Sequence, residues 1–293
     1  MASDPSWPGV AGKQVLITGA TSGIGLAAAV ELARRGAKLA IVARSRERAA
    51  EAVRSIKAAS SSATVDVLEA DLASQASVRK LAVEALARYA RIDVLVNNAG
   101  AINASRKLTD EGFELTWAVN HLAPFLLTTL LEDRLRASAP ARVVTTSSGA
   151  HRGAHVPFDD LAAERSYGMR GFERYGQSKL ANILFTRELA RRLEGTGVSA
   201  FCFHPGLVDT GFNRNNGLLM GIGMAIARPF SRTAEKGAET LVWLVDSADA
   251  GPSGAYFTDL RPTKPTAAGQ DADVARRLWE VSLTQTAPAL APG

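Results

Sequence analysis

A tyrosine and a lysine lie one helical turn apart in the segment YGQSK, at Tyr175 and Lys179. The surrounding residues 174–193 predict an amphipathic helix, in which residues four apart project from one face. A phenol has a pKa of about 10, too high for easy proton transfer near neutral pH, and a nearby ammonium group favours the phenolate. Tyr175 could therefore act as an acid or base. An isolated pair of this kind is usually an exposed helix pair. The other motifs of the chain therefore have to show whether Tyr175 and Lys179 are part of a catalytic site.

A glycine-rich segment, TGATSGIG at 18–25, follows the first predicted strand. Gly19, Gly23 and Gly25 would let the backbone approach a pyrophosphate, and the next helix would offer its N–H groups and positive dipole end. The spacing G-x-x-x-G-x-G differs from the common G-x-G-x-x-G fingerprint, and any tight turn favours glycine. The position directly after the first strand nevertheless favours phosphate binding.

The end of the second predicted strand bears on the choice of cofactor. Sites for NAD place an acidic side chain there, which bonds the ribose 2′-hydroxyl. This chain has Ala43 at that place, followed by Arg44. A guanidinium can bind a 2′-phosphate through two hydrogen bonds, which favours NADP(H). The alternative is that Arg44 is only a solvated loop charge.

Short apolar runs alternate with longer helical ones. Strands are predicted over 13–18, 38–43, 64–72, 92–100, 142–148, 197–206 and 254–257, and helices over 25–37, 45–59, 74–90, 109–137, 174–193, 233–247 and 273–284. Apolar strands between amphipathic helices indicate a doubly wound parallel sheet that is covered on both faces. We expect one α/β domain over 1–293, with loose proline-rich ends at 4–9 and 286–293.

Composition narrows the function classes. The 293 residues are 46% hydrophobic, enough for a large core. No apolar run reaches about 18 residues and no secretion signal opens the chain, so we expect a cytoplasmic protein without an integral membrane segment. The single cysteine, Cys202, excludes an intrachain disulfide and a cysteine metal site. The net charge of +5 is spread along the helices, which predicts a solvated surface and no nucleic-acid partner.

The segments TGATSGIG, NNAG (97–100) and YGQSK (175–179) together resemble the short-chain dehydrogenase/reductase family, in its order and spacing. The resemblance covers about 12–260, and the segments WAVNHLAPFLLT and HPGLVDT are most similar to the branch of retinol dehydrogenases and the WW-domain oxidoreductase. It implies an NAD(P)-dependent oxidoreductase on a single Rossmann-type domain. The expected fold is a three-layer sandwich with a seven-stranded parallel sheet, and no metal site is expected.

The resemblance also implies site residues where the motifs match. The catalytic positions are Asn120, Ser148, Tyr175 and Lys179. The cofactor-binding positions are Gly19, Thr21, Ser22, Gly23, Ile24, Gly25, Arg44, Asp71, Leu72, Asn98, Ala99, Gly100, Tyr175, Lys179, Pro205, Gly206, Val208 and Thr210. Asp71 is expected to bond the adenine amino group, and Thr210 the nicotinamide carboxamide.

The chemistry expected of these residues is hydride transfer coupled to proton transfer. Lowering the phenol pKa of Tyr175 by about 3 units takes roughly 4 kcal/mol, which Lys179 and an oxidised nicotinamide could supply together. Ser148 would stabilise charge on the substrate oxygen. Asn120 would hold a water that links Lys179 to solvent, unless it only kinks or caps its helix. His204 is expected to pack beside the sheet.

Two segments are expected to form the substrate pocket, because ligands bind beyond the carboxyl ends of the strands. One is the loop 149–171, and the other is 207–232, which contains the apolar, glycine-rich run 217–227. The second segment is interpreted as a lid over a lipophilic substrate. The alternatives are a contact in a homodimer or a peripheral membrane contact through 217–227.

The leading hypothesis is an NADP(H)-dependent enzyme that interconverts a carbonyl and an alcohol on a lipophilic small molecule. A cofactor-binding regulatory or scaffold protein on the same fold is the alternative from another class. A sugar-nucleotide epimerase-like enzyme is disfavoured by the short region after the sixth strand. A serine hydrolase is disfavoured because no G-x-S-x-G segment is present.

Overall fold

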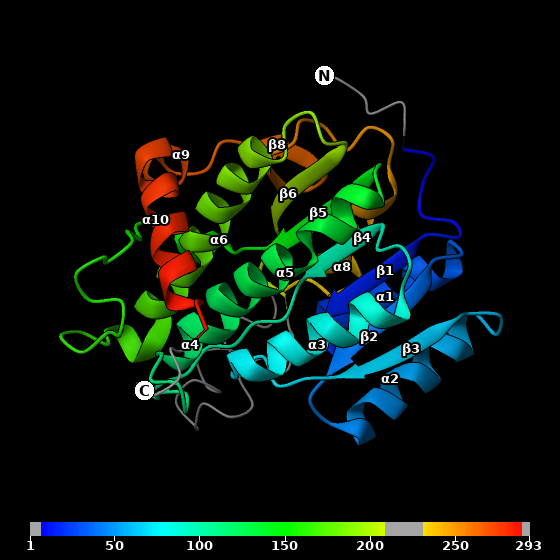
Figure 1. Ribbon diagram of the computed structural model, residues 1–293, viewed down its shortest axis with the longest axis horizontal. Helices are drawn as coiled ribbons and strands as arrows, with labels where there is room; N and C mark the ends of the chain where they lie inside the picture. The colour runs from blue at the N-terminus through cyan, green and yellow to red at the C-terminus, as the bar shows by residue number, and fades with distance from the viewer. Residues whose placement is uncertain (1–6, 209–230, 289–293) are drawn as a thin grey trace.

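The computed structural model describes residues 7–208 and 231–288. Its strands form one sheet in the order β3-β2-β1-β4-β5-β6-β7-β8 (Figure 1). Their bounds are β1 Gln14–Thr18, β2 Lys38–Ala43, β3 Val65–Glu69, β4 Val94–Asn97, β5 Ala141–Thr146, β6 Val198–His204, β7 Tyr256–Thr258 and β8 Arg261–Thr263. The first seven strands are parallel, as predicted, and the chain forms a single doubly wound domain.

The eighth strand was not predicted. β8 pairs antiparallel with β7 across a two-residue turn, in which Asp259 and Leu260 both have positive φ, at 51° and 62°. Hairpin turns of this hand usually show Asn or Gly, and the strand Arg261–Thr263 is exposed and contains a proline. The sequence therefore has neither the Asn or Gly of a typical hairpin turn nor an alternating apolar pattern in the strand that follows.

Helices cover both faces of the sheet. Their bounds are α1 Gly23–Arg34, α2 Arg46–Ala59, α3 Gln75–Arg88, α4 Leu115–Trp117, α5 Ala123–Ala137, α6 Phe172–Arg192, α8 Ala234–Asp246, α9 Ala267–Gln270 and α10 Ala272–Gln285. α1, α2 and α8 pack on one face, and α3, α5 and α6 on the other. Val15 and Ile17 of β1 point to the first group and Leu16 to the second, so this central strand is apolar on both faces because both faces are buried.

The helix expected over 109–137 starts later than predicted. Leu108 and Glu114 form an antiparallel bridge, and the Glu114 carboxylate then caps α4 by accepting the N–H groups of Thr116 and Trp117. A π-helical turn, Ala118–Leu122, separates α4 from α5. π-helical turns are rare and are found most often at functional sites, and this one contains Asn120.

Two observations concern the surface and the ends. Trp7, within the segment 4–9 for which a loose end was expected, is buried, and its ring centroid lies 4.2 Å from the Arg142 guanidinium.

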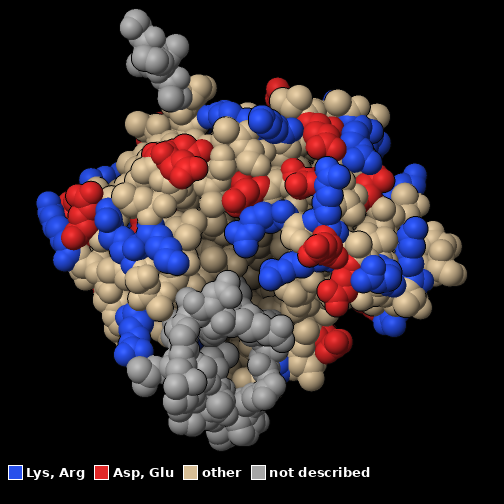
Figure 2. All heavy atoms as spheres, turned by 90° about the horizontal axis from the view of Figure 1, so that it is seen from below, with Lys and Arg blue, Asp and Glu red and all other residues tan. Residues whose placement is uncertain are grey.

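Basic and acidic side chains are intermixed on the face shown in Figure 2. None of the described helices combines the length and apolar character that crossing a membrane requires.

Candidate active site

Tyr175 and Lys179 lie on one face of α6, near its start. The Lys179 ammonium is 5.5 Å from the centre of the Tyr175 ring, and the lysine is only 2% exposed. Its Nζ donates to the carbonyl oxygen of Thr146 at the end of β5, at 3.1 Å. The interpretation as an ordinary exposed helix pair is therefore wrong. Burying an ammonium group costs free energy unless the group is paired or hydrogen-bonded.

Without a bound nicotinamide, burial dominates the electrostatics of this pair. Burial raises the pKa of Tyr175 to about 12, although the hydrogen bond with Ser148 acts in the opposite direction. Burial also lowers the pKa of Lys179 to about 8. Among the protein's own groups, desolvation thus outweighs the effect of Ser148 on the phenol. Tyr175 is protonated at neutral pH, which is the form that can give a proton to a carbonyl oxygen.

Ser148 lies just beyond β5 and meets Tyr175. Its side chain caps a short 3₁₀ turn, Gly149–His151, by accepting the N–H of Ala150 at 3.2 Å. Its hydroxyl also acts on the Tyr175 phenol, where it lowers the pKa against the effect of burial. The two predicted catalytic hydroxyls, 27 residues apart in the sequence, therefore lie close together, and their catalytic roles stay predictions.

Asn120 joins the exit of β4 to α6. Its Oδ1 accepts the N–H of Ala101 at 2.7 Å, and its Nδ2 donates to the Ala101 carbonyl and to Ser178 Oγ, both at 2.9 Å. Ser178 Oγ donates in turn to the Tyr175 carbonyl at 2.7 Å. The π-helical turn turns Asn120 inward to make these contacts, so a structural role is established, while the role in a water relay stays a prediction.

The glycine turn is packed against the end of β4. A Cβ at Gly25 would lie 2.1 Å from the Gly19 carbonyl oxygen and 2.4 Å from Asn98 Nδ2, and one at Gly19 would lie 2.7 Å from Ala99 Cα. Gly19 also has a φ of +68°. Thr18 Oγ1 accepts the N–H groups of Asn98 and Ala99, both at 3.1 Å. A side chain at Gly19 or Gly25 would clash with the neighbouring backbone, so only glycine fits at either position. Without side chains there, the backbone N–H groups of the turn can approach a phosphate.

The remaining predicted cofactor positions flank this turn. Ser22 precedes the first turn of α1 without using its side chain as a cap, and Gly23 has a φ of +54°. Ile24 and Val208 both lie against Gly237 of α8, where a Cβ would meet Val208 Cγ2 at 2.6 Å and Ile24 Cγ1 at 3.2 Å. Thr21, Leu72 and Gly100 are each partly buried. Thr210 lies outside the described residues.

Arg44 and Asp71 lie at the far end of the candidate cofactor site. Arg44 is exposed directly after β2, and within residues 7–208 and 231–288 no acidic side chain forms an ion pair with it. The Asp71 carboxylate accepts the N–H of Ala73 at 3.0 Å. A guanidinium that is not neutralised by the described part of the chain fits an anionic ligand group, and the binding roles of both residues stay predictions.

Sequence reasoning missed the role of His204. Its Nδ1 accepts the N–H of Gly149 at 3.1 Å and that of Gly206 at 3.4 Å. It therefore connects the Ser148 segment to the turn of Pro205 and Gly206, beyond simple packing beside the sheet. Thr146 was missed as well, because it acts through its carbonyl oxygen, which binds Lys179 and Asn182 and carries no sequence signal.

Comparisons with known proteins agree with this geometry. The family model for short chain dehydrogenase matches residues 13–218. Human retinol dehydrogenase 14 is 42% identical over 288 residues, which cover 92% of this chain and 85% of that protein. The structure of an uncharacterised protein from Mycobacterium Paratuberculosis has a TM-score of 0.76 at 34% identity, covering 97% of each chain. A short chain dehydrogenase from Burkholderia cenocepacia J2315, in complex with NADP, has a TM-score of 0.68 at 28% identity and covers 85% of this chain and 96% of that one.

Proposed function

The chain belongs to the short-chain dehydrogenase family, close to the retinol dehydrogenases, and from this premise we propose that it is an NADP(H)-dependent oxidoreductase that interconverts a carbonyl and an alcohol on a lipophilic small molecule. Tyr175 is the acid or base of the reaction. The observation that carries the proposal is the buried Lys179 ammonium, 5.5 Å from the centre of the Tyr175 ring, with Ser148 acting on the same phenol. An oxidoreductase acting on alcohols or carbonyls follows from the family, and the cofactor preference, the acid and the substrate class are our inferences.

The residues present fit a dinucleotide. Gly19 and Gly25 form a cradle that a Cβ would fill, and the N-terminus of α1 lies directly behind it. The pyrophosphate would be held there, and the adenosine end would extend towards Asp71 and Arg44. The Burkholderia relative was solved with NADP, and exposed Arg44 suits the additional 2′-phosphate. These points support NADP(H) over NAD(H).

The protein's part of the chemistry is proton transfer and charge stabilisation. The bound nicotinamide supplies or accepts the hydride. For reduction, the protonated Tyr175 phenol gives its proton to the substrate oxygen, while the Ser148 hydroxyl donates a hydrogen bond to the charge that develops on that oxygen. Lys179 lies beside the ring and stabilises the tyrosinate that remains.

A lipophilic substrate is supported by the surroundings of the site. Met169, Phe172 and Leu207 are large apolar side chains that are 80%, 43% and 48% exposed. Phe172 opens the helix that carries Tyr175, and Leu207 follows the turn of Pro205 and Gly206. The curated relative that matches over most of the chain is named for an alcohol, retinol. The proposed lid, 207–232, lies mostly outside the described residues.

The test is a turnover assay with retinal, long-chain aldehydes and steroid ketones, run with NADPH and NADH in parallel. We expect turnover with a markedly higher kcat/KM for NADPH, and Arg44→Asp should erase or reverse the preference, because a carboxylate repels the 2′-phosphate. Equal affinities of the wild type for the two cofactors would contradict the charge argument. Tight NADPH binding without turnover on the whole panel would favour the regulatory or scaffold alternative.

A further inference from the structure

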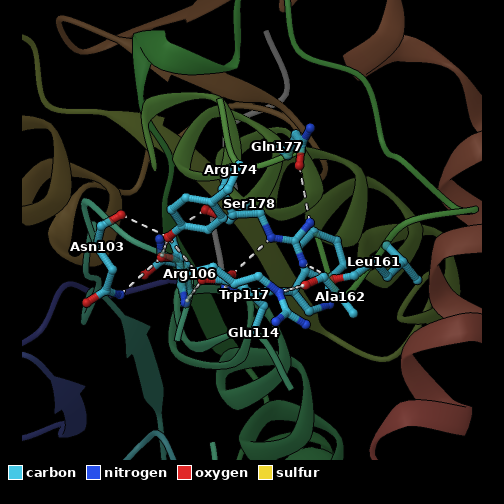
Figure 3. A network of polar contacts seen from close by, with 12 residues as sticks. Asn103, Arg106, Glu114, Trp117, Leu161, Ala162, Arg174, Gln177 and Ser178 are labelled. Carbon is cyan, nitrogen blue, oxygen red and sulfur yellow. Dashed lines mark hydrogen bonds and ion pairs between the residues drawn. The ribbon is translucent and has the colours of Figure 1, made fainter. Parts of the chain in front are cut away.

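A fully buried ion pair lies one residue before Tyr175. Arg174 Nε donates to Glu114 Oε2 at 3.0 Å, with side chains that are 1% and 0% exposed (Figure 3). The guanidinium also donates to Gln177 Oε1 and to the Leu161 carbonyl, and it lies 4.6 Å from the centre of the Trp117 ring. The catalytic hydrogen bonds described above include neither Glu114 nor Arg174.

The carboxylate is as fully engaged as the guanidinium. Glu114 accepts the N–H groups of Thr116 at 2.9 Å and Trp117 at 2.8 Å, and the Tyr167 hydroxyl donates to it at 3.2 Å. The same hydroxyl proton is shared with the Asn103 carbonyl oxygen, which lies 2.8 Å from Tyr167 OH. The pair therefore connects three segments: the exit of β4, the start of α4 and the loop that precedes α6.

Stability alone is a weak explanation for this arrangement. Taking two charges out of water is costly, and well-packed apolar residues often replace a buried ion pair without loss. Desolvation is also the largest influence on Arg174, lowering its pKa against the effect of Glu114. What the pair provides is a fixed geometry, since the bonds of both partners are directional.

The start of α6 needs an external anchor. Its N-cap is Gly171 at a φ of 82°, which offers no side-chain cap, and the two residues before it, Met169 and Arg170, also have positive φ, at 50° and 52°. Helix ends usually satisfy their free N–H groups through a cap side chain. α6 has no such cap. Its start is fixed in another way, because the side chain of Arg174, in the first turn, is held by the Glu114 carboxylate that caps α4. The helix that carries Tyr175 is thus positioned by a residue of another helix.

A second connection joins the same two helical segments. Asn120, in the π-helical turn after α4, bonds Ser178, which bonds the Tyr175 carbonyl. The Glu114–Arg174 pair lies before Tyr175 and the Asn120–Ser178 bond lies after it. A shift of the start of α6 relative to α4 would move the phenol away from Ser148 and away from the substrate oxygen.

We propose that Glu114 and Arg174 are positioning residues for Tyr175: their buried ion pair holds the start of α6 against α4, so that the phenol meets Ser148 in a reactive geometry. This role deepens the proposed function and rests on it. A misplacement of about 1 Å can cost on the order of 100-fold in rate. Loss of the pair should therefore act on kcat more than on cofactor binding, because most of the predicted cofactor positions, the glycine turn before α1 among them, are not on α6.

The experiment compares Arg174→Met, Arg174→Lys and Glu114→Gln with the wild type. We expect Arg174→Met to lower kcat about 10- to 100-fold at saturating NADPH, with the Kd for NADPH within about twofold. Arg174→Lys should lose less, because an ammonium keeps the charge but not the planar fork. The matched control is Glu188→Gln at the other end of α6, where the carboxylate is buried and binds Arg191 and Arg192; its kcat should stay at the wild-type level.

A second measurement does not depend on turnover. Ultraviolet titration of each variant, referenced to the same variant with Tyr175→Phe, gives the pKa of Tyr175 itself. In Arg174→Met it should shift because the phenol loses its position beside Ser148 and Lys179, and in Glu188→Gln it should not move. If the wild type turns over no carbonyl, the proposed function fails and this titration alone decides the positioning role. If Arg174→Met does not fold, Arg174→Lys and Glu114→Gln are judged by the same criteria. An unchanged kcat and Tyr175 pKa in folded variants, or an equal loss in the control, would overturn the proposal.

Discussion

The glycine turn lies at the same edge of the sheet as the proposed catalytic cluster, which is Ser148, Tyr175 and Lys179 with the supporting Glu114–Arg174 pair. The two regions are held in place by different forces. At the turn, contact and neutral hydrogen bonds suffice: Gly19 and Gly25 leave room for backbone, and Thr18 and Asn98 bridge neighbouring strands. At the cluster, Lys179 and the Glu114–Arg174 pair are charges taken out of water. The geometry of the glycine turn depends on the absence of side chains. The geometry of the cluster depends on buried charged side chains that need hydrogen-bond or ion-pair partners.

This difference predicts how each region fails. Neutral close packing tolerates a wide range of pH but not an added methyl group, because interiors are as dense as crystals. Buried charges tolerate small changes of volume but not the loss of a partner, which costs about 3–5 kcal/mol. Mutations in the turn should therefore impair cofactor binding, and mutations in the cluster should impair the chemical step.

The largest effect is expected for Tyr175→Phe. Removing the hydroxyl removes the proton donor, which is worth about 10²- to 10⁴-fold in kcat for general acid–base catalysis. The Kd for NADPH should stay within about twofold of the wild type, as measured by quenching or enhancement of cofactor fluorescence. Tyr89→Phe is the matched control, because Tyr89 follows α3 and its phenol binds Asp66 of β3, so its loss should leave kcat unchanged. Full activity of Tyr175→Phe would remove the basis for the comparison.

A smaller effect of the opposite kind is expected for Gly25→Ala. The new Cβ would lie 2.1 Å from the Gly19 carbonyl oxygen, so the turn must move. Overpacking of this kind costs about 1–3 kcal/mol, which corresponds to roughly 5- to 150-fold in the Kd for NADPH. Titration calorimetry with NADPH measures it directly. Gly195→Ala, at a positive φ of 76° but with open space around its Cβ, is the control for backbone strain alone and should bind NADPH normally. Normal binding by Gly25→Ala would show that the turn does not approach the cofactor.

The same contrast explains what could be predicted from the sequence. The parallel strands and the glycine turn are encoded in contiguous residues, whose periodicity and spacing can be recognised before folding. Tyr175 and Lys179 were also recognisable, because four residues place them on one helix face. The strand β8 and the π-helical turn were not, since neither has a local pattern that sets it apart.

The supporting contacts of the cluster were hidden for another reason. Glu114 and Arg174 are 60 residues apart, and a glutamate after a turn or an arginine in a helix is ordinary by itself. The lowered pKa of Tyr175 was predicted for Lys179 and a bound oxidised nicotinamide together and stays a prediction, whereas the raising effect of burial was not visible in the sequence. Pairing and desolvation are tertiary properties, and they determine the electrostatics of the cluster more than the motif does.

The smallest effect is expected at His204, which belongs to both regions. Its Nδ1 accepts N–H groups from Gly149, beside Ser148, and from Gly206, in the turn expected to border the nicotinamide. His204→Ala leaves both donors without this partner, at a cost of about 1–3 kcal/mol when they are shielded from water, and should lower kcat/KM by about tenfold. His204→Asn keeps an acceptor and should recover most of the activity. Equal kcat/KM for the wild type and His204→Ala would show that the connection is dispensable.

The pH dependence of stability distinguishes this role from simple packing. Burial, with a contribution from Arg152, lowers the pKa of His204 to about 4 in the folded protein, whereas the unfolded chain titrates near 6.5. Between these values the unfolded state binds the additional proton, so stability is complete above about pH 6.5 and is lost as the pH falls towards 4, by at most about 1.4 kcal/mol per pH unit. His204→Asn cannot take up this proton, so its denaturation midpoint should fall less steeply over the same range. Identical slopes for the wild type and His204→Asn would mean that His204 takes up its proton at the same pH in the folded as in the unfolded protein, so that its Nδ1 is not held as an acceptor.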